Sequence, residues 1–102
     1  MIKGKWLNYA IATIKACDQG AGSGSQIAED VGGSPSYVAK VVASLRNAHI
    51  IDNNYELVKP AQQITIREVA TASGCYQVDG DLAHKVFDIV FKALEVPVTS
   101  IW

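Results

Sequence analysis

The chain has 102 residues, of which 49% are hydrophobic and 19% charged, and its formal net charge is −1 at pH 7. This length and composition predict one globular domain and exclude a long disordered tail. No apolar run approaches the roughly 20 residues that cross a bilayer, and the N-terminus lacks the pattern of a signal peptide. Two cysteines, Cys17 and Cys75, with no secretory pattern around them, suggest a reducing cytosol and free thiols. We therefore expect a cytoplasmic protein with no membrane partner.

Two helices are predicted first along the chain. The first covers about residues 5–18, because apolar residues recur there at helical spacing: Leu7, Ala10, Ile11, Ile14 and Cys17. Ser23 followed three residues later by Gln26 is a capping-box pattern, which predicts the start of a short second helix. The pair Gly32-Gly33 ends that helix.

The third predicted helix runs from residue 35 to about residue 47. Ser34 suits an N-cap, and Pro35 suits the first helical position, where its missing N–H costs nothing. The face expected to lie inward consists of Val38, Val41, Val42 and Leu45. Two short helices joined by a Gly-Gly turn are typical of a helix-turn-helix.

A small β-hairpin is predicted directly after the third helix. Two short apolar runs flank the residues Asp52-Asn53-Asn54. Because Asn tolerates positive φ well, Asn53-Asn54 can form a two-residue hairpin turn. The expected fold class is thus mainly α with a small β-hairpin, namely a winged helix-turn-helix with a C-terminal dimerisation helix.

A fourth helix is predicted from the capping box Thr65 to Glu68 until about Ser73, and a last helix over about residues 81–95. The last helix is apolar on more than one face, so one side is expected to meet its own core and the other a partner. The candidate dimerisation residues are Phe87, Ile89, Val90, Phe91 and Leu94. A central helix of a monomer is the alternative. A homodimer is favoured, because helix-turn-helix proteins usually bind two half-sites.

The order of these motifs resembles a known family. The segments "KGKW", "SQIAEDVGGSPSYVAKVVASLRNAHII" and "YELVKPAQQITIREVATA" are similar to the winged-helix regulators of the Rrf-two family. That family includes the iron–sulphur-cluster regulator, the nitrite-sensing repressor and the cysteine-metabolism regulator. The resemblance is close over about residues 3–72 and loose beyond. It implies a bacterial homodimeric transcription regulator whose third helix reads the major groove of double-stranded DNA.

The resemblance also implies which residues contact DNA. Ser36 and Tyr37 fall where the family contacts DNA at the start of the recognition helix, and Lys40 lies one turn further on. Ser34 is expected to cap this helix, whose N-terminus attracts a phosphate. Lys5 resembles a basic residue that family members direct at the DNA backbone. A core or rim aromatic is the alternative for Tyr37, and a solvated helix face is the alternative for Lys40 and Arg46.

Two departures from the family concern the hairpin and the cysteines. Family wings carry a basic, glycine-rich tip, whereas Asp52-Asn53-Asn54 contains no Arg and no Gly. We therefore expect a structural hairpin whose minor-groove contact is lost or much weakened. Cluster-binding members have three cysteines before the last helix, but this loop has only Cys75, so no iron–sulphur or zinc site and no cofactor is expected. Cys75 is a candidate redox thiol, with an ordinary turn residue as the alternative.

These features leave two function classes. No nucleophile elbow, phosphate loop or carboxylate pair is present, so we expect no enzyme. A DNA-binding regulator is favoured by the start of the third helix. A winged-helix interaction module that has lost DNA is favoured by the short hairpin and by the charge balance, because residues 1–60 carry six basic residues against five acidic ones. The proposed division is a DNA-binding domain over residues 1–74, with residues 75–102 adding the loop and the dimerisation helix to one compact unit.

Overall fold

A computed structural model describes residues 4–72, 97–100 and 102 of the chain. These residues form four α-helices and two short 3-10 helices, with no β-strand among them: α1 (Gly4–Asp18), α2 (Gly24–Val31), α3 (Pro35–Asn47), η1 (Ala61–Gln63), α4 (Ile66–Ala72) and η2 (Val98–Ser100). The described part of the chain is therefore mainly helical, as the sequence predicted. The expected helix over residues 81–95 lies outside the described residues.

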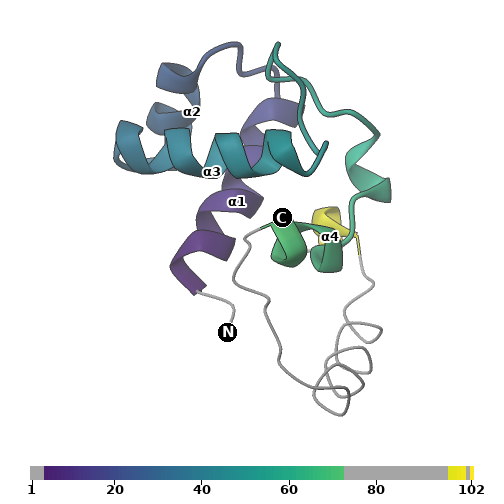
Figure 1. Ribbon diagram of the computed structural model, residues 1–102. Helices are drawn as coiled ribbons and strands as arrows, with labels where there is room; N and C mark the ends of the chain where they lie inside the picture. The colour runs from purple at the N-terminus through teal and green to yellow at the C-terminus, as the bar shows by residue number, and fades with distance from the viewer. Residues whose placement is uncertain (1–3, 73–96, 101) are drawn as a thin grey trace.

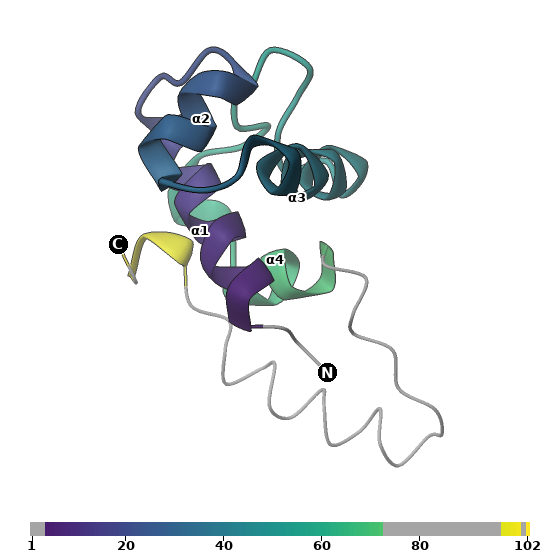
Figure 2. The same cartoon turned by 90° about the vertical axis from the view of Figure 1, so that its left-hand side faces the viewer.

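The helices pack around α1. Both α2 and α3 contact α1 and each other, and α4 contacts α1 and α3. Figures 1 and 2 show α3 crossing α1, with α2 and α4 toward opposite ends of α1. The end of the described chain returns to this bundle, because Val98 N donates to Ile64 O at 2.8 Å and η2 contacts η1.

One hydrophobic core holds these elements together. Its fully enclosed members include Ile14 of α1, Ile27 of α2, Leu45 of α3 and Val69 of α4. The predicted inward face of α3 is confirmed, since Val38, Val41, Val42 and Leu45 are all buried. Burying a side chain of this size removes apolar area worth about 1.5–3 kcal/mol from water. Each helix is therefore fixed mainly by its apolar stripe.

The predicted ends of the first two helices are confirmed. The Ser23 hydroxyl accepts a hydrogen bond from Gln26 N at 3.1 Å and caps α2. At the other end Gly32 has φ 75°, a left-handed conformation that glycine adopts without a steric penalty. The N–H groups of Gly32 and Gly33 both donate to Ala28 O. This cap stops α2 and leaves only a short turn before α3.

The prediction of a two-residue turn at Asn53-Asn54 is wrong. Among the described non-glycine residues, positive φ occurs at His49 (59°) and Tyr55 (61°), and neither asparagine adopts it. The turn instead spans Asp52 to Tyr55, with Tyr55 N donating to Asp52 O at 3.3 Å. Tyr55 takes the left-handed position after the turn that a bulged three-residue loop requires. One antiparallel bridge, between Ile51 and Leu57, closes the loop in place of the expected strands.

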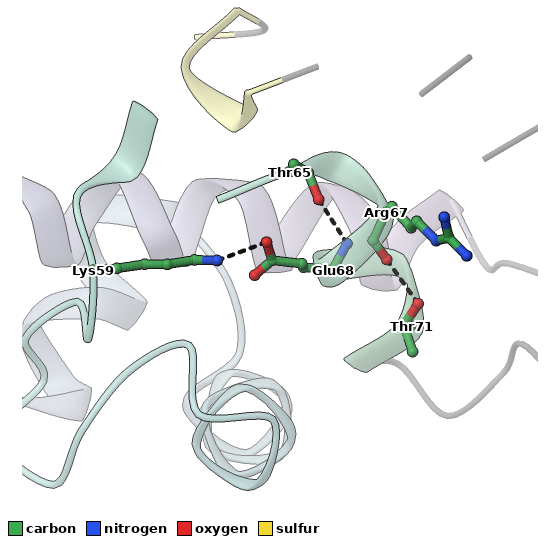
Figure 3. A network of polar contacts seen from close by, with 5 residues as sticks. All are labelled: Lys59, Thr65, Arg67, Glu68 and Thr71. Atoms are coloured by element: carbon green, nitrogen blue, oxygen red, sulfur yellow. Dashed lines mark hydrogen bonds and ion pairs between the residues drawn. The ribbon is translucent and has the colours of Figure 1, made fainter. Parts of the chain in front are cut away.

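The N-terminus of α4 is held by its own cap and by an ion pair. Thr65 Oγ1 accepts from Glu68 N at 3.2 Å, as the capping box predicted. The Glu68 carboxylate meets Lys59 Nζ at 2.7 Å (Figure 3). Both charged side chains are more than one-third exposed, so the pair adds little stability. It does join the segment after the turn to α4.

None of the described helices is both long enough and apolar enough to cross a lipid bilayer.

Candidate nucleic-acid interface

The start of α3 is an exposed polar surface. Ser34 and Ser36 are exposed, and their hydroxyl oxygens lie 3.0 Å apart. Ser34 occupies the N-cap position and Pro35 follows it, as predicted. The expected cap by the Ser34 hydroxyl is wrong, because this hydroxyl accepts no hydrogen bond from the described backbone of the first turn of α3. The Ser34 hydroxyl instead shares a hydrogen bond with the Ser36 hydroxyl. The N–H groups of that turn are left without this cap, and Pro35 has none to offer.

Lys5 and Tyr37 come from different helices and meet at this surface. Lys5 Nζ lies over the Tyr37 ring, 4.8 Å from its centroid. A cation at this distance is attracted by the electron-rich face of the ring. Lys5 is exposed and Tyr37 is half-buried against the core. The structure thus brings together two residues that the sequence suggested separately.

Lys40 extends the same surface by one helical turn. It is exposed, and it lies three and four residues beyond Tyr37 and Ser36, which places the three on neighbouring positions of α3. Neither α3 nor the first turn of α1 contains an acidic residue. We call Lys5, Ser34, Ser36, Tyr37 and Lys40 the α3 surface. This surface offers two hydroxyls and two ammonium groups, and neither α3 nor the first turn of α1 places a carboxylate among them.

Tyr9, which lies beside this surface, was not singled out from the sequence. The Tyr9 ring contacts the Tyr37 ring edge-on, with centroids 4.7 Å apart and planes at 64°. The same ring lies directly against Gly33, in the turn between α2 and α3. The spacing of Lys5 and Tyr9 by four residues puts both on one face of α1 and was the available signal.

Arg46 lies in the last turn of α3, but its guanidinium contacts the turn that follows and is not part of a solvated helix face. Its Nε donates to Asp52 O at 3.2 Å, and its terminal nitrogen donates to Asn53 O at 3.4 Å. The guanidinium carbon lies 4.5 Å from the centroid of the Tyr55 ring. These contacts fasten the turn to the C-terminal end of α3. A groove of about 280 Å³ lies beside this turn and is lined by Gly24, Ser25, Pro35, Ala39, Val42, Arg46 and Tyr55.

The sequence predicted no metal site, one candidate redox thiol and a set of dimerisation residues, and several of these residues are not described by the structure. Cys75 and the dimerisation residues Phe87, Ile89, Val90, Phe91 and Leu94 lie outside the described residues. Within the described ranges, no group of three or more His, Cys, Asp or Glu side chains could hold a metal ion. Cys17 is a buried free thiol, and its burial raises its pKa from 9.0 to about 11. At neutral pH it is a packed core group and not a nucleophile.

Comparison with known proteins adds no family assignment. The chain matches no model of a known protein family, and it matches no curated protein.

Proposed function

We propose that this protein is a homodimeric DNA-binding transcription regulator that reads the major groove through α3. The α3 surface carries the proposal. It joins two ammonium groups, two hydroxyls and an aromatic side chain at one helix start, and α3 contributes no acid to it. Lysines neutralise phosphates, while hydroxyls and an aromatic ring contact base edges or the backbone.

The proposed fold is a winged helix-turn-helix. In this interpretation α2 and α3 are the two helices of the motif, and the turn from Asp52 to Tyr55 is a reduced wing. The turn fits a structural role, because its backbone carbonyls are engaged by Arg46. Its exposed tip consists of Asn53 and Asn54, which carry no positive charge. The reading of DNA therefore depends on α3 and on the start of α1.

A second candidate is a winged-helix interaction module that does not bind DNA. The charge of the chain favours it, since a net charge of −1 is unusual for a protein that relies on phosphate neutralisation. Arg46 favours this candidate as well. Its guanidinium is half-buried and hydrogen-bonded to the turn, so it is less available to a DNA phosphate. The two candidates differ in one measurable property, which is the salt dependence of binding to duplex DNA.

Fluorescence anisotropy with a random duplex and with a duplex selected by the protein tests the proposal. Affinity should fall steeply with salt, and Lys40→Ala should reduce the slope of log affinity against log salt by about 1. Lys15→Ala is the charge-matched control. Lys15 is exposed on α1 but lies ten residues from Lys5, about 15 Å along the helix axis. The control should leave the slope unchanged.

Tyr37→Ala should weaken binding to the selected duplex more than binding to the random one, because a base or ring contact carries sequence information. Replacement of both Asn53 and Asn54 by Gly should cost less affinity than either α3 change. A larger loss from the turn would make it a reading element. Binding that ignores salt, together with no effect of any of the three changes, would favour the interaction module.

A further inference from the structure

Two adjacent glycines connect α2 to α3, and they are required for different reasons. Gly32 has φ 75°, so its backbone conformation requires glycine, and a Cβ there would meet no atom within 4 Å. Gly33 has no such φ, yet a Cβ there would lie 2.2 Å from Cε1 of Tyr9 and 2.7 Å from its Oη. Glycine is therefore required at position 33 because the Tyr9 ring occupies the space that a Cβ atom at this position would need.

The Tyr9 ring therefore fills the corner between this turn and α3. On one side it lies against the Gly33 backbone, and on the other it meets the Tyr37 ring edge-on at 4.7 Å. Tyr37 in turn carries Lys5 Nζ over its ring at 4.8 Å. A chain of contacts runs from Gly33 through Tyr9 and Tyr37 to Lys5, and it joins the turn to both helices that form the α3 surface.

We infer that Tyr9 is a positioning residue that sets the orientation of Tyr37 and Lys5, and that Gly33 supplies the space it needs. The inference rests on the proposed DNA-binding function and names two residues that act on recognition without belonging to the α3 surface. Long side chains lose rotamer freedom when they bind a ligand. If the Tyr37 ring and the Lys5 ammonium group are already held in one orientation, they lose less rotamer freedom on binding. Pre-organisation of this kind raises the affinity for a matching partner.

Pre-organisation of Tyr37 and Lys5 should raise the affinity for a selected DNA sequence more than the affinity for random DNA. Non-specific binding needs only positive charge near phosphates, and a mobile Lys5 still provides it. Sequence-dependent contacts need Tyr37 in one orientation. Loss of the Tyr9 contact should therefore lower the ratio of specific to random affinity, while the salt slope changes little.

Gly33→Ala and Gly32→Ala form a matched pair that separates positioning from stability. Gly33→Ala adds a methyl group that displaces the Tyr9 ring, at a backbone conformation that alanine adopts. Gly32→Ala strains the backbone in open space and leaves the Tyr9 ring untouched. Tyr9→Ala removes the ring, and Tyr9→Phe keeps its edge contact. Thermal unfolding identifies the variants that remain folded at the assay temperature.

The first readout needs no DNA. In NMR spectra the ε-methylene protons of Lys5 should be shifted upfield by the Tyr37 ring, relative to those of Lys15. Gly33→Ala and Tyr9→Ala should remove this shift, and Gly32→Ala and Tyr9→Phe should keep it. The second readout is the ratio of affinities for the selected and random duplexes. It should fall about five- to tenfold in the first pair of variants, which corresponds to one lost aromatic contact, and stay unchanged in the second pair.

Two results on the variants would overturn the inference. One is an upfield Lys5 shift that survives Gly33→Ala and Tyr9→Ala. The other is a lost shift with an unchanged affinity ratio, which would leave Tyr9 a packing residue. Failure of the proposed function looks different, because the wild-type protein itself would then show no salt-dependent binding to either duplex. That result would also remove the recognition role of Tyr9.

Discussion

The guanidinium of Arg46 makes its contacts with the turn that follows α3. It donates to two backbone carbonyls, of Asp52 and Asn53, and lies over the Tyr55 ring. A cation used in this way stabilises the fold and is less available to a phosphate. Lys5 and Lys40 are exposed instead. The positive charge of a residue therefore does not by itself assign it to the interface.

Cys17 gives the stability of the protein a predictable dependence on pH. Burial is the main cause of its pKa of about 11 in the folded state, with the neighbouring Asp52 charge acting in the same direction and Arg46 opposing it. The folded pKa is raised, so this contribution is fully present below pH 9, the usual thiol range. It is lost as the pH rises through about 11, and the loss is on the order of 2 kcal/mol.

Urea unfolding of the wild type and of Cys17→Ala, between pH 8 and pH 11, measures this contribution. The two proteins share every other ionisable group, so the effect of those groups cancels in the difference between the two free energies of unfolding. That difference should shrink as the pH rises. A difference that stays constant across this range would contradict the raised pKa.

The turn from Asp52 to Tyr55 is an element built around one side chain. Asp52 Oδ1 accepts from Asn54 N at 2.8 Å and from Glu56 N at 3.0 Å. The backbone N–H of Asp52 donates to Glu56 O at 2.9 Å. Short polar side chains that bond the backbone ahead of them favour such turns. The negative charge of Asp52 disfavours contact with DNA phosphates, and these hydrogen bonds show that Asp52 has a structural role in the turn.

Asp52→Ala should therefore destabilise the protein by about 1 kcal/mol, since two backbone N–H groups exchange a protein acceptor for water. Asp52→Asn keeps an oxygen at the same position and should recover most of this loss. Urea unfolding at pH 7 compares the three proteins. Equal stability of the Ala and Asn variants would show that the carboxylate oxygen does not hold the turn.

At the scale of the whole molecule, the proposed assembly depends on the helix expected over residues 81–95. Phe91→Glu should convert the dimer into a monomer, because it would bury an unpaired charge in the contact. Lys92→Glu changes charge at the next position without replacing an apolar side chain, and should leave the dimer intact. Light scattering at tens of micromolar, roughly the range of a modest interface, measures the mass of each protein. A monomeric wild type would exclude the dimer.

Much of the fold follows from local sequence. Helical spacing of apolar residues, the caps at Ser23 and Thr65 and the proline at residue 35 predicted the described helices close to their observed ends. These signals act within a few residues, so no tertiary contact is needed to recognise them. The residues of the α3 surface came from a resemblance, and their role in binding stays a prediction.

Tertiary contacts decided the features that no local pattern predicts. The sequence favoured positive φ at Asn53-Asn54, but Tyr55 takes that conformation in a turn whose Asp52 and Asn53 carbonyls are bonded by Arg46 of α3. Likewise, the sequence shows Gly33 only as half of a Gly-Gly pair, and the Tyr9 ring that occupies its side-chain space comes from another helix. Propensity contributes at most about 1 kcal/mol at one residue, which a few packed contacts between distant segments outweigh.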